Sequence, residues 1–290
     1  MNPVEVVKLT PLMAHTRGSP DVTVGLIDGP VAMSHPDLMG ASIREIPGSL
    51  AGTCASASSA ACRHGTFVAG ILGARRDSPA PAICPDCPLL LRPIFAETTL
   101  GNGQMPSATP AELAAALLEC IEAGARLINV SSALADFSST GQRAIEEALG
   151  QALRRGVLVV VAAGNQGTLG SSAITRHPWV IPVVACDLHG RPLRSTNLGR
   201  SIGRRGLSAP GEEITSLGAE GPPLTLGGTS AAAPFVTGAI ALLWSGVPHA
   251  AARAVHGAIT HAAAPRRPTV VPPLLDAWAA YQRLRQTYAG

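Results

Sequence analysis

The feature of this 290-residue sequence that most constrains its fold is a series of short apolar runs that alternate with longer helical patterns. Runs that are apolar at nearly every position are typical of parallel strands covered on both faces of a sheet. The alternation therefore predicts an α/β fold, with a doubly wound, mostly parallel sheet and helices on both faces, in three layers. The predicted strands are DVTVGLID (21–28), CPLLLRPIF (87–95), RLINVS (126–131), VLVVVAAG (157–164) and WVIPVVAC (179–186).

Helical patterns fill most of the chain between and after these runs. The segment 140–156 ends in basic residues and glycine, which suits the helix dipole and the C-cap. Segment 187–227 is rich in Gly and Pro and predicts loops and short strands. We see no internal repeat and no low-complexity tail, so we expect residues 1–290 to form a single domain. The other predicted helices are 64–73, 110–125, 230–244, 249–264 and 274–290.

Composition excludes several classes of function. Only 14% of the residues are charged, the net charge is +3 and the basic residues are scattered, so a nucleic-acid partner is not expected. No apolar stretch reaches the ~20 residues of a membrane span, and residues 1–18 lack the pattern of a secretory signal. We therefore expect a cytoplasmic protein with no membrane partner, although a lost leader stays open. The sequence does not determine the oligomeric state.

Six cysteines leave three interpretations open. Cys54 and Cys62 form one close pair, and Cys84 and Cys87 form another. Four thiolates are able to bind a structural zinc ion, two pairs are able to form local disulfides, or all four stay reduced. The spacing of the first pair is not that of a zinc knuckle, so disulfides or plain thiols are favoured. Cys120 and Cys186 fall on a helix and a strand pattern, where we expect small buried side chains.

Three candidate catalytic residues fall where parallel strands end or helices begin. Asp28 ends the first predicted strand in GLIDGP, His64 opens a helix in RHGTFVAG, and Ser230 opens another in GGTSAAAP. Sites in open α/β sheets form at the carboxyl ends of the strands. A serine hydroxyl becomes a nucleophile when a histidine takes its proton, and a buried carboxylate orients that histidine. The three residues therefore predict nucleophilic acyl transfer.

Asn165 follows another predicted strand in VVVAAGNQG and is a candidate donor to a tetrahedral oxyanion, together with the Ser230 backbone N–H. Each residue alone also has a plain structural interpretation. Asp28 and Asn165 suit turns, His64 suits a helix cap, and Ser230 suits an N-cap with Pro234 harmless in the first turn. All four together, each at the end of an element, favour the catalytic interpretation.

The order Asp…His…Ser is that of subtilisin. The motifs VGLIDGP, HGTFVAGIL, INVSSA, VVVAAGNQG, LSAPGEEI and GGTSAAAPFVTGAIALL, spread over residues 21–245, resemble those of subtilisin-like serine proteases (subtilases). The resemblance implies a triad of Asp28, His64 and Ser230, with Asn165 as the oxyanion donor. It also implies that Ser131, Ser132 and Ala133 form one wall of the cleft and pair with the substrate backbone. Ala163 and Gly164, with Ala162 before them, would line the other wall of the first specificity pocket.

The sequence departs from the usual subtilase pattern at a few positions. Asp28 is followed by Gly29 and Pro30 instead of Ser or Thr and then Gly, and Phe67 stands where the helix motif has His. Ala133 and Leu134 stand where glycines are usual in the cleft segment. These departures concern substrate pairing and pocket size, and they leave the triad residues in place.

The stretches LIDGPVAMSHPDL and ARRDSPAPAICPDCPLLLRPIF resemble a narrower group, the proteases that mature cyanobactins and related ribosomally made peptides. That resemblance implies a precursor-peptide substrate. The cyclising members carry a helical cap between the aspartate and histidine motifs, whereas the gap here is rich in Ser, Ala and Gly, so hydrolysis is favoured. A transpeptidase or macrocyclase, and a general degradative subtilase, remain alternatives. A non-catalytic binding protein is disfavoured because all four residues are present.

No cofactor is expected. The sequence contains no obvious loop of clustered carboxylates of the kind that binds calcium, so calcium is not indicated and no metal ligand is assigned. The first candidate catalytic residue lies close to residue 1, from which we expect the chain to fold without a pro-region of the secreted-subtilase kind.

Overall fold

The computed structural model describes residues 2–97, 108–131, 139–262 and 269–288. Its centre is a seven-stranded sheet with the strand order β2-β3-β1-β4-β5-β6-β7, in which every neighbouring pair is parallel. This confirms the predicted α/β class. The strands are β1 (Val24–Asp28), β2 (Ile43–Glu45), β3 (Leu89–Pro93), β4 (Leu127–Val130), β5 (Leu158–Ala162), β6 (Val180–Cys186) and β7 (Leu207–Pro210).

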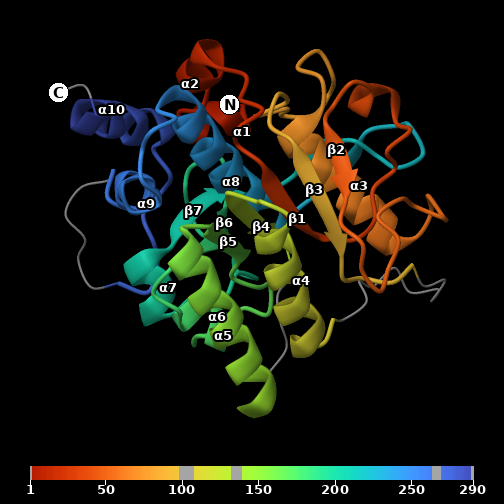
Figure 1. Cartoon of the computed structure of the whole chain (residues 1–290). Coiled ribbons are helices and arrows are strands. Elements are labelled where there is room, and N and C mark those ends of the chain that lie inside the picture. Colours follow the sequence, from red (N-terminus) through yellow and green to blue (C-terminus); the bar gives the residue numbers. More distant parts are fainter. Residues whose placement is uncertain (1, 98–107, 132–138, 263–268, 289–290) are drawn as a thin grey trace.

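Helices cover both faces of the sheet (Figure 1). Helices α4 and α5 pack together on one face, while α3 and α8 pack together on the other. Each of the five predicted strands is present but shorter at one or both ends, because the sequence pattern includes flanking turn residues. The helices of four or more residues are α1 (Pro3–Val6), α2 (Thr10–His15), α3 (Ala60–Gly73), α4 (Pro110–Glu122), α5 (Ser139–Arg155), α6 (Ala173–Arg176), α7 (Arg200–Arg205), α8 (Thr229–Gly246), α9 (Ala252–Thr260) and α10 (Ala277–Tyr288).

Helix α8 forms the centre of the core. Its 18 residues are long and apolar enough to cross a membrane, but 83% of that window is buried inside the protein. It contacts β4, β5, β6 and β7 on the sheet and α9 and α10 behind it. A core helix passes the same test of length and apolarity as a membrane span, and burial on all sides assigns α8 to the core. Within the described ranges it is the one helix that passes this test.

Several predicted helix starts differ from the structure, and two of these helices carry candidate catalytic residues. The helix that carries His64 begins at Ala60, capped by the Ser59 hydroxyl, so His64 lies one turn inside it and does not open it. Helix α8 begins at Thr229, so Pro234 lies beyond the first turn. Proline lacks the N–H that would bond the carbonyl of Ser230 four residues earlier. The helical ladder is therefore interrupted at the candidate nucleophile.

Segment 187–227 contains more order than its composition suggests. It holds α7, the sheet strand β7 and an antiparallel hairpin of β8 (Ile214–Ser216) and β9 (Leu224–Leu226). Two residues separate the end of β9 from the start of α8. The hairpin therefore lies immediately before the helix that carries Ser230.

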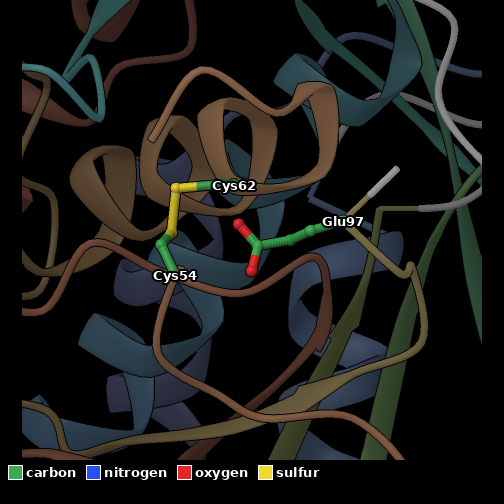
Figure 2. A group of neighbouring side chains, drawn as sticks. All are labelled: Cys54, Cys62 and Glu97. Atoms are coloured by element: carbon green, nitrogen blue, oxygen red, sulfur yellow. A yellow bond between two sulfur atoms is a disulfide. The ribbon is translucent and has the colours of Figure 1, made fainter. Parts of the chain in front are cut away.

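The cysteines resolve into one disulfide and four buried thiols. Cys54 and Cys62 are joined, which links the loop before α3 to its first turn. Figure 2 shows the Glu97 carboxylate directed at this corner, where it accepts hydrogen bonds from the N–H of Ala55, the N–H of Ser56 and the hydroxyl of Ser59. Cys84, Cys87, Cys120 and Cys186 are buried free thiols. The last two occupy the small buried positions expected of them.

Candidate active site

The carboxyl ends of the central strands bring the first two candidate residues together. Asp28 is the last residue of β1 and is fully buried. Its Oδ1 lies 2.6 Å from Nδ1 of His64, on α3, whose side chain is 12% exposed. The same Oδ1 accepts the backbone N–H of Gly29 at 2.6 Å. The carboxylate therefore fixes one ring nitrogen of His64 and leaves Nε2 as the nitrogen that is able to accept a proton.

Opposing influences act on the pKa of His64. Burial of the ring is the largest single influence and lowers the pKa, but the negative charge of Asp28 and its hydrogen bond together outweigh it. The pKa of His64 is therefore raised above its usual 6.5. The second carboxylate oxygen, Oδ2 of Asp28, is buried and has no hydrogen-bond partner within the described part of the chain. A buried carboxylate of this kind, hydrogen-bonded through one of its two oxygens, stabilises a neighbouring imidazolium.

Two glycines allow α3 to approach the end of β1 this closely. A Cβ at Gly29 would lie 2.1 Å from the carbonyl oxygen of Ala61, and a Cβ at Gly65 would lie 2.4 Å from the carbonyl oxygens of Gly29 and Pro30. Both contacts are with backbone, which has little freedom to move aside. The departure at Gly29 from the usual Ser or Thr therefore has a steric reason in this chain, because α3 occupies the space of a side chain.

Ser230 is the second residue of α8, and the structure removes its plain interpretation as an N-cap. The N-cap is Gly228, with φ of 106°, and no side chain caps this helix end. The positive φ is a conformation that glycine adopts readily. Helix α8 packs against α3, the helix that carries His64. The Ser230 hydroxyl is thus free of a capping role, at a helix N-terminus that favours negative charge.

Asn165 is held by a residue that the sequence analysis missed. Its Oδ1 accepts hydrogen bonds from the backbone N–H of Thr229 at 2.9 Å and from the Thr229 hydroxyl at 3.1 Å. The same hydroxyl accepts the N–H of Gly164 at 3.1 Å. Because Thr229 occupies the carbonyl end of this amide, the NH₂ end remains to donate. Thr229 precedes the candidate serine, which is the signal by which a second hydroxyl with a positioning role could have been found.

The predicted cleft walls are described only in part. Ser131 directly follows β4 and is buried, and its hydroxyl accepts a hydrogen bond from Asn129 at 2.6 Å. Ser132 and Ala133 lie outside the described residues. Ala163 and Gly164 follow β5 and are buried. A second missed residue, Asn197, braces this wall by donating its backbone N–H to the Gly164 carbonyl and its side-chain amide to the Ala163 carbonyl.

The residues that could hold a metal ion are few. In the parts of the chain that the structure covers, one group of three sulfur or carboxylate ligands lies within 4.8 Å, namely Cys54, Cys62 and Glu97 (Figure 2). Its two sulfurs are bonded to each other, and its carboxylate already accepts three hydrogen bonds. Thiolates, not a disulfide, bind metals. This group therefore does not fit a resident metal ion in its oxidised state.

The arrangement is suited to acyl transfer. A buried carboxylate orients an imidazole from β1, and a serine lies at the start of a helix that packs against the histidine's helix. An amide with a free NH₂ end is bonded to the residue before that serine. Strands β1 and β5 are separated by β4 alone, so their ends lie about 10 Å apart at the usual strand spacing. The side chains of these elements are thus able to meet above β4.

Comparison with known proteins gives the family of this chain. The model of the Subtilase family matches residues 19–283. Fervidolysin from Fervidobacterium pennivorans is 31% identical over 279 residues, which cover 85% of this chain but 38% of fervidolysin. Subtilisin DY from Bacillus licheniformis is 27% identical over 265 residues, which cover 90% of each chain. The chain thus spans well under half of one relative and nearly all of the other.

Solved structures with the same fold include enzymes of peptide maturation. A serine-to-alanine mutant of the protease domain of PatA has a TM-score of 0.83 and 31% identity, covering 93% of this chain and 97% of that one. The prenylagaramide maturation protease PagA has a TM-score of 0.81 and 30% identity, covering 95% and 98%. The PatG macrocyclase in complex with peptide, at 23% identity and a TM-score of 0.80, shares the fold. On the match over residues 19–283, this chain belongs to the subtilase family of serine peptidases.

Proposed function

We propose that this protein is a serine endopeptidase that hydrolyses peptide bonds with Asp28, His64 and Ser230 as its triad and Asn165 as the oxyanion donor. The observation that carries this proposal is the contact of 2.6 Å between the buried Asp28 carboxylate and Nδ1 of His64. An Asp-Gly turn or a helix-capping histidine has no need of such a contact. A general base held in one tautomer does need it.

The residues divide the reaction among them. Nε2 of His64 takes the proton of the Ser230 hydroxyl as its oxygen attacks the scissile carbonyl. Asp28 stabilises the imidazolium that forms, and the NH₂ group of Asn165 and the Ser230 N–H donate to the developing oxyanion. His64 then gives its proton to the leaving amine. Water then attacks the acyl-enzyme and gives a proton to Nε2 of His64. His64 returns this proton to the Ser230 oxygen as the second product leaves.

We propose further that the substrate is a ribosomally made precursor peptide. Support comes from PatA and PagA, named as patellamide and prenylagaramide maturation proteases, which match nearly the full length of this chain at about 30% identity. The proposed cleft walls, Ser131 to Ala133 on one side and Ala163 and Gly164 on the other, would bind the acyl half of that peptide. A peptide is thus the proposed partner, and the proposed location is cytoplasmic. At that location the Cys54–Cys62 disulfide would have to form in a compartment that keeps most thiols reduced.

A macrocyclase is the second candidate, and the segment between Asp28 and His64 argues against it. In this segment the structure has a single 3₁₀ turn at Pro36–Leu38, the short strand β2 and the first turn of α3. Nothing here forms a helical cap over the site that would exclude water from the acyl-enzyme. Water is then the acceptor available in greatest excess, and hydrolysis follows.

Mass spectrometry of the products distinguishes these candidates. A linear precursor peptide incubated with the protein should yield two fragments whose summed mass exceeds that of the precursor by one water. A macrocyclase would release a fragment without that water. Cleavage of unrelated unfolded proteins at a similar rate would favour a general degradative subtilase. Ser230→Ala serves as the control, because it removes one oxygen from the side chain and should abolish every product.

Calcium dependence forms a separate part of the proposal. We propose that catalysis needs no cofactor and no metal ion. The test is turnover before and after treatment with a calcium chelator, together with equilibrium dialysis against calcium. Tight binding, or loss of activity that calcium restores, would refute this part and leave the triad untouched.

A further inference from the structure

A cavity adjoins the candidate oxyanion donor, and the described residues of the proposed cleft walls, Ser131, Ala163 and Gly164, are not part of its lining. Its volume is about 600 Å³, and it is lined by residues that include Asn165, Gly228, Leu193, Thr225, Glu212 and Glu213. Gly228 is the N-cap of the helix that carries Thr229 and Ser230, and Asn165 is hydrogen-bonded to Thr229. The cavity therefore opens directly beside the atoms that would cleave the peptide.

The order of the strands tells which half of a substrate would enter this cavity. The proposed acyl-side wall begins at Ser131, after β4, whereas Leu193 follows β6 and the two glutamates follow β7. Strand β5, which leads to Asn165, lies between these two groups in the sheet. If the acyl half of the peptide lies over β4, the half that leaves with the new amine extends toward β6 and β7. That half reaches the cavity.

The glutamates belong to a segment that is hydrogen-bonded to Gly228, the N-cap of the helix that carries Ser230. Gly211, which immediately precedes them, accepts the N–H of Gly228 at 2.7 Å through its carbonyl. A Cβ at Gly211 would lie 2.6 Å from the Gly228 carbonyl oxygen, so the two backbones are in direct contact. Movement of one segment would therefore move the other. The backbone that carries Glu212 and Glu213 is thus positioned close to the start of the helix that carries Ser230.

The cavity carries a negative charge that nothing in its lining neutralises. Glu212 and Glu213 are both exposed, and neither carboxylate has an ion-pair or hydrogen-bond partner among the described residues. The other lining residues are uncharged. The chain as a whole has a net charge of +3, so this local excess of negative charge runs against the overall balance. Two such charges beside a leaving amine favour cations in the residues that follow the cut.

We propose that this cavity binds the residues on the leaving side of the scissile bond, and that Glu212 and Glu213 make the enzyme prefer Lys or Arg there. This inference rests on the proposed peptidase function and names the substrate feature that the function leaves open. An acidic residue at the same place would meet two like charges. The enzyme thereby distinguishes precursor peptides by the sequence released after the cut.

The test uses a mixture of randomised peptides, cut by the whole protein, with the residues on both sides of each cut identified by mass spectrometry. We expect Lys and Arg to be enriched roughly three- to tenfold in the first two positions after the cut, since exposed ion pairs are individually weak. The enrichment should shrink at about 1 M salt, where the Debye length is about 3 Å. Glu212→Gln with Glu213→Gln should remove it.

A matched control removes the same charge elsewhere. Glu122 and Glu147 are exposed glutamates on α4 and α5, on the face of the sheet opposite α3 and α8. The pair of changes Glu122→Gln and Glu147→Gln should therefore leave the enrichment unchanged. Cuts without enrichment of basic residues, or enrichment that survives the Glu212 and Glu213 changes, would overturn the inference alone. A protein that folds but cuts no peptide would overturn the proposed function, and the inference with it.

Discussion

The side-chain oxygen of Asn165 accepts two hydrogen bonds from Thr229, one from its backbone N–H and one from its hydroxyl. Thr229 precedes the candidate nucleophile, so the donor and the nucleophile are fixed relative to one another through a single residue. The same hydroxyl accepts the N–H of Gly164, which ties the end of β5 to the start of α8. The geometry of the oxyanion site is therefore built into the backbone of two elements that are far apart in sequence.

The first prediction concerns Thr229. Thr229→Val keeps the shape and the backbone N–H but removes the hydroxyl, so Asn165 loses one of its two anchors. We expect kcat to fall about tenfold with little change in KM, because the amide is misplaced only when it must meet the oxyanion. Asn165→Ala should cost roughly 10²–10³ in kcat, the range known for a subtilisin asparagine. Steady-state kinetics on one peptide substrate measures both.

The double variant is the control for this pair. If Thr229 acts through Asn165, adding Thr229→Val to Asn165→Ala should cost almost nothing further. Losses that multiply would mean that the hydroxyl acts independently of the amide.

The second prediction concerns the dependence of activity on pH. His64 must be neutral to accept the serine proton, and Asp28 raises the pKa of His64 above 6.5 in spite of the burial that lowers it. We expect kcat/KM to rise with pH along a limb whose midpoint lies above 6.5. Asp28→Asn removes the charge and should shift the residual activity's midpoint to lower pH. A wild-type midpoint below 6.5 would contradict the Asp28–His64 pairing.

The raised pKa of His64 also affects stability, which should fall with rising pH while activity rises. The protonated His64 is favoured in the folded state, so its contribution to stability is fully present below about pH 6.5 and is lost as the pH rises through the folded-state pKa. Urea denaturation at several pH values should show this trend. In His64→Gln the trend should flatten.

The third prediction concerns the contact between α3 and β1. Gly29→Ala places a Cβ 2.1 Å from the Ala61 carbonyl oxygen, so α3 must move away from β1 and carry His64 with it. We expect a stability loss of about 1–3 kcal/mol and a fall in kcat. The midpoint of the pH limb should also move toward lower pH, since the charge of Asp28 becomes more distant. That second readout separates a positioning role from simple destabilisation.

Gly257→Ala is the matched control, because Gly257 lies inside α9 with nothing within 4 Å of its Cβ position. It should keep full activity and gain stability, since alanine favours helices. A Gly29→Ala variant with unaltered kinetics would show that α3 accommodates a side chain at position 29, and would contradict this prediction.

The fourth prediction concerns the disulfide. Cys54 and Cys62 close a loop with a sequence separation of 8, for which the loop entropy lost in the unfolded chain is worth about 2–3 kcal/mol. Reducing agent should lower the stability of the wild type by about this amount and leave Cys54→Ser with Cys62→Ser unaffected. Cys84→Ala with Cys87→Ala is the control, because those thiols are free and the variant should respond to reductant as the wild type does. An equal response in all three proteins would refute the pairing.

Much of the fold follows from the sequence, and the reason is local. Strands β1, β3, β4, β5 and β6 at the centre of the sheet are apolar at nearly every position, and each predicted strand is found. Strand β2 has too few apolar residues to give a pattern, since all three of its residues are partly or fully exposed. Helix α7 was missed because its sequence, RSIGRR, has neither an apolar face nor a side-chain cap.

The site was predictable in its residue types and less so in its geometry. As the sequence predicts, Asp28 ends β1, Ser230 lies in the first turn of α8 and Asn165 follows β5. His64 differs, because it lies one turn inside α3. The role of Thr229 depends on its partner Asn165, which is 64 residues away and which no local pattern connects to it. The need for glycine at position 29 depends on Ala61, on another element, and no local pattern reports such a contact.

The proposed function depends above all on whether Ser230 is an activated nucleophile. The most direct measurement is covalent labelling of the purified protein with a fluorophosphonate probe, followed by identification of the modified residue by mass spectrometry. We predict a single adduct on Ser230, absent from Ser230→Ala and strongly reduced in His64→Ala, with all three proteins folded. A folded wild type that takes up no probe, or that takes it up on another residue, would contradict the triad.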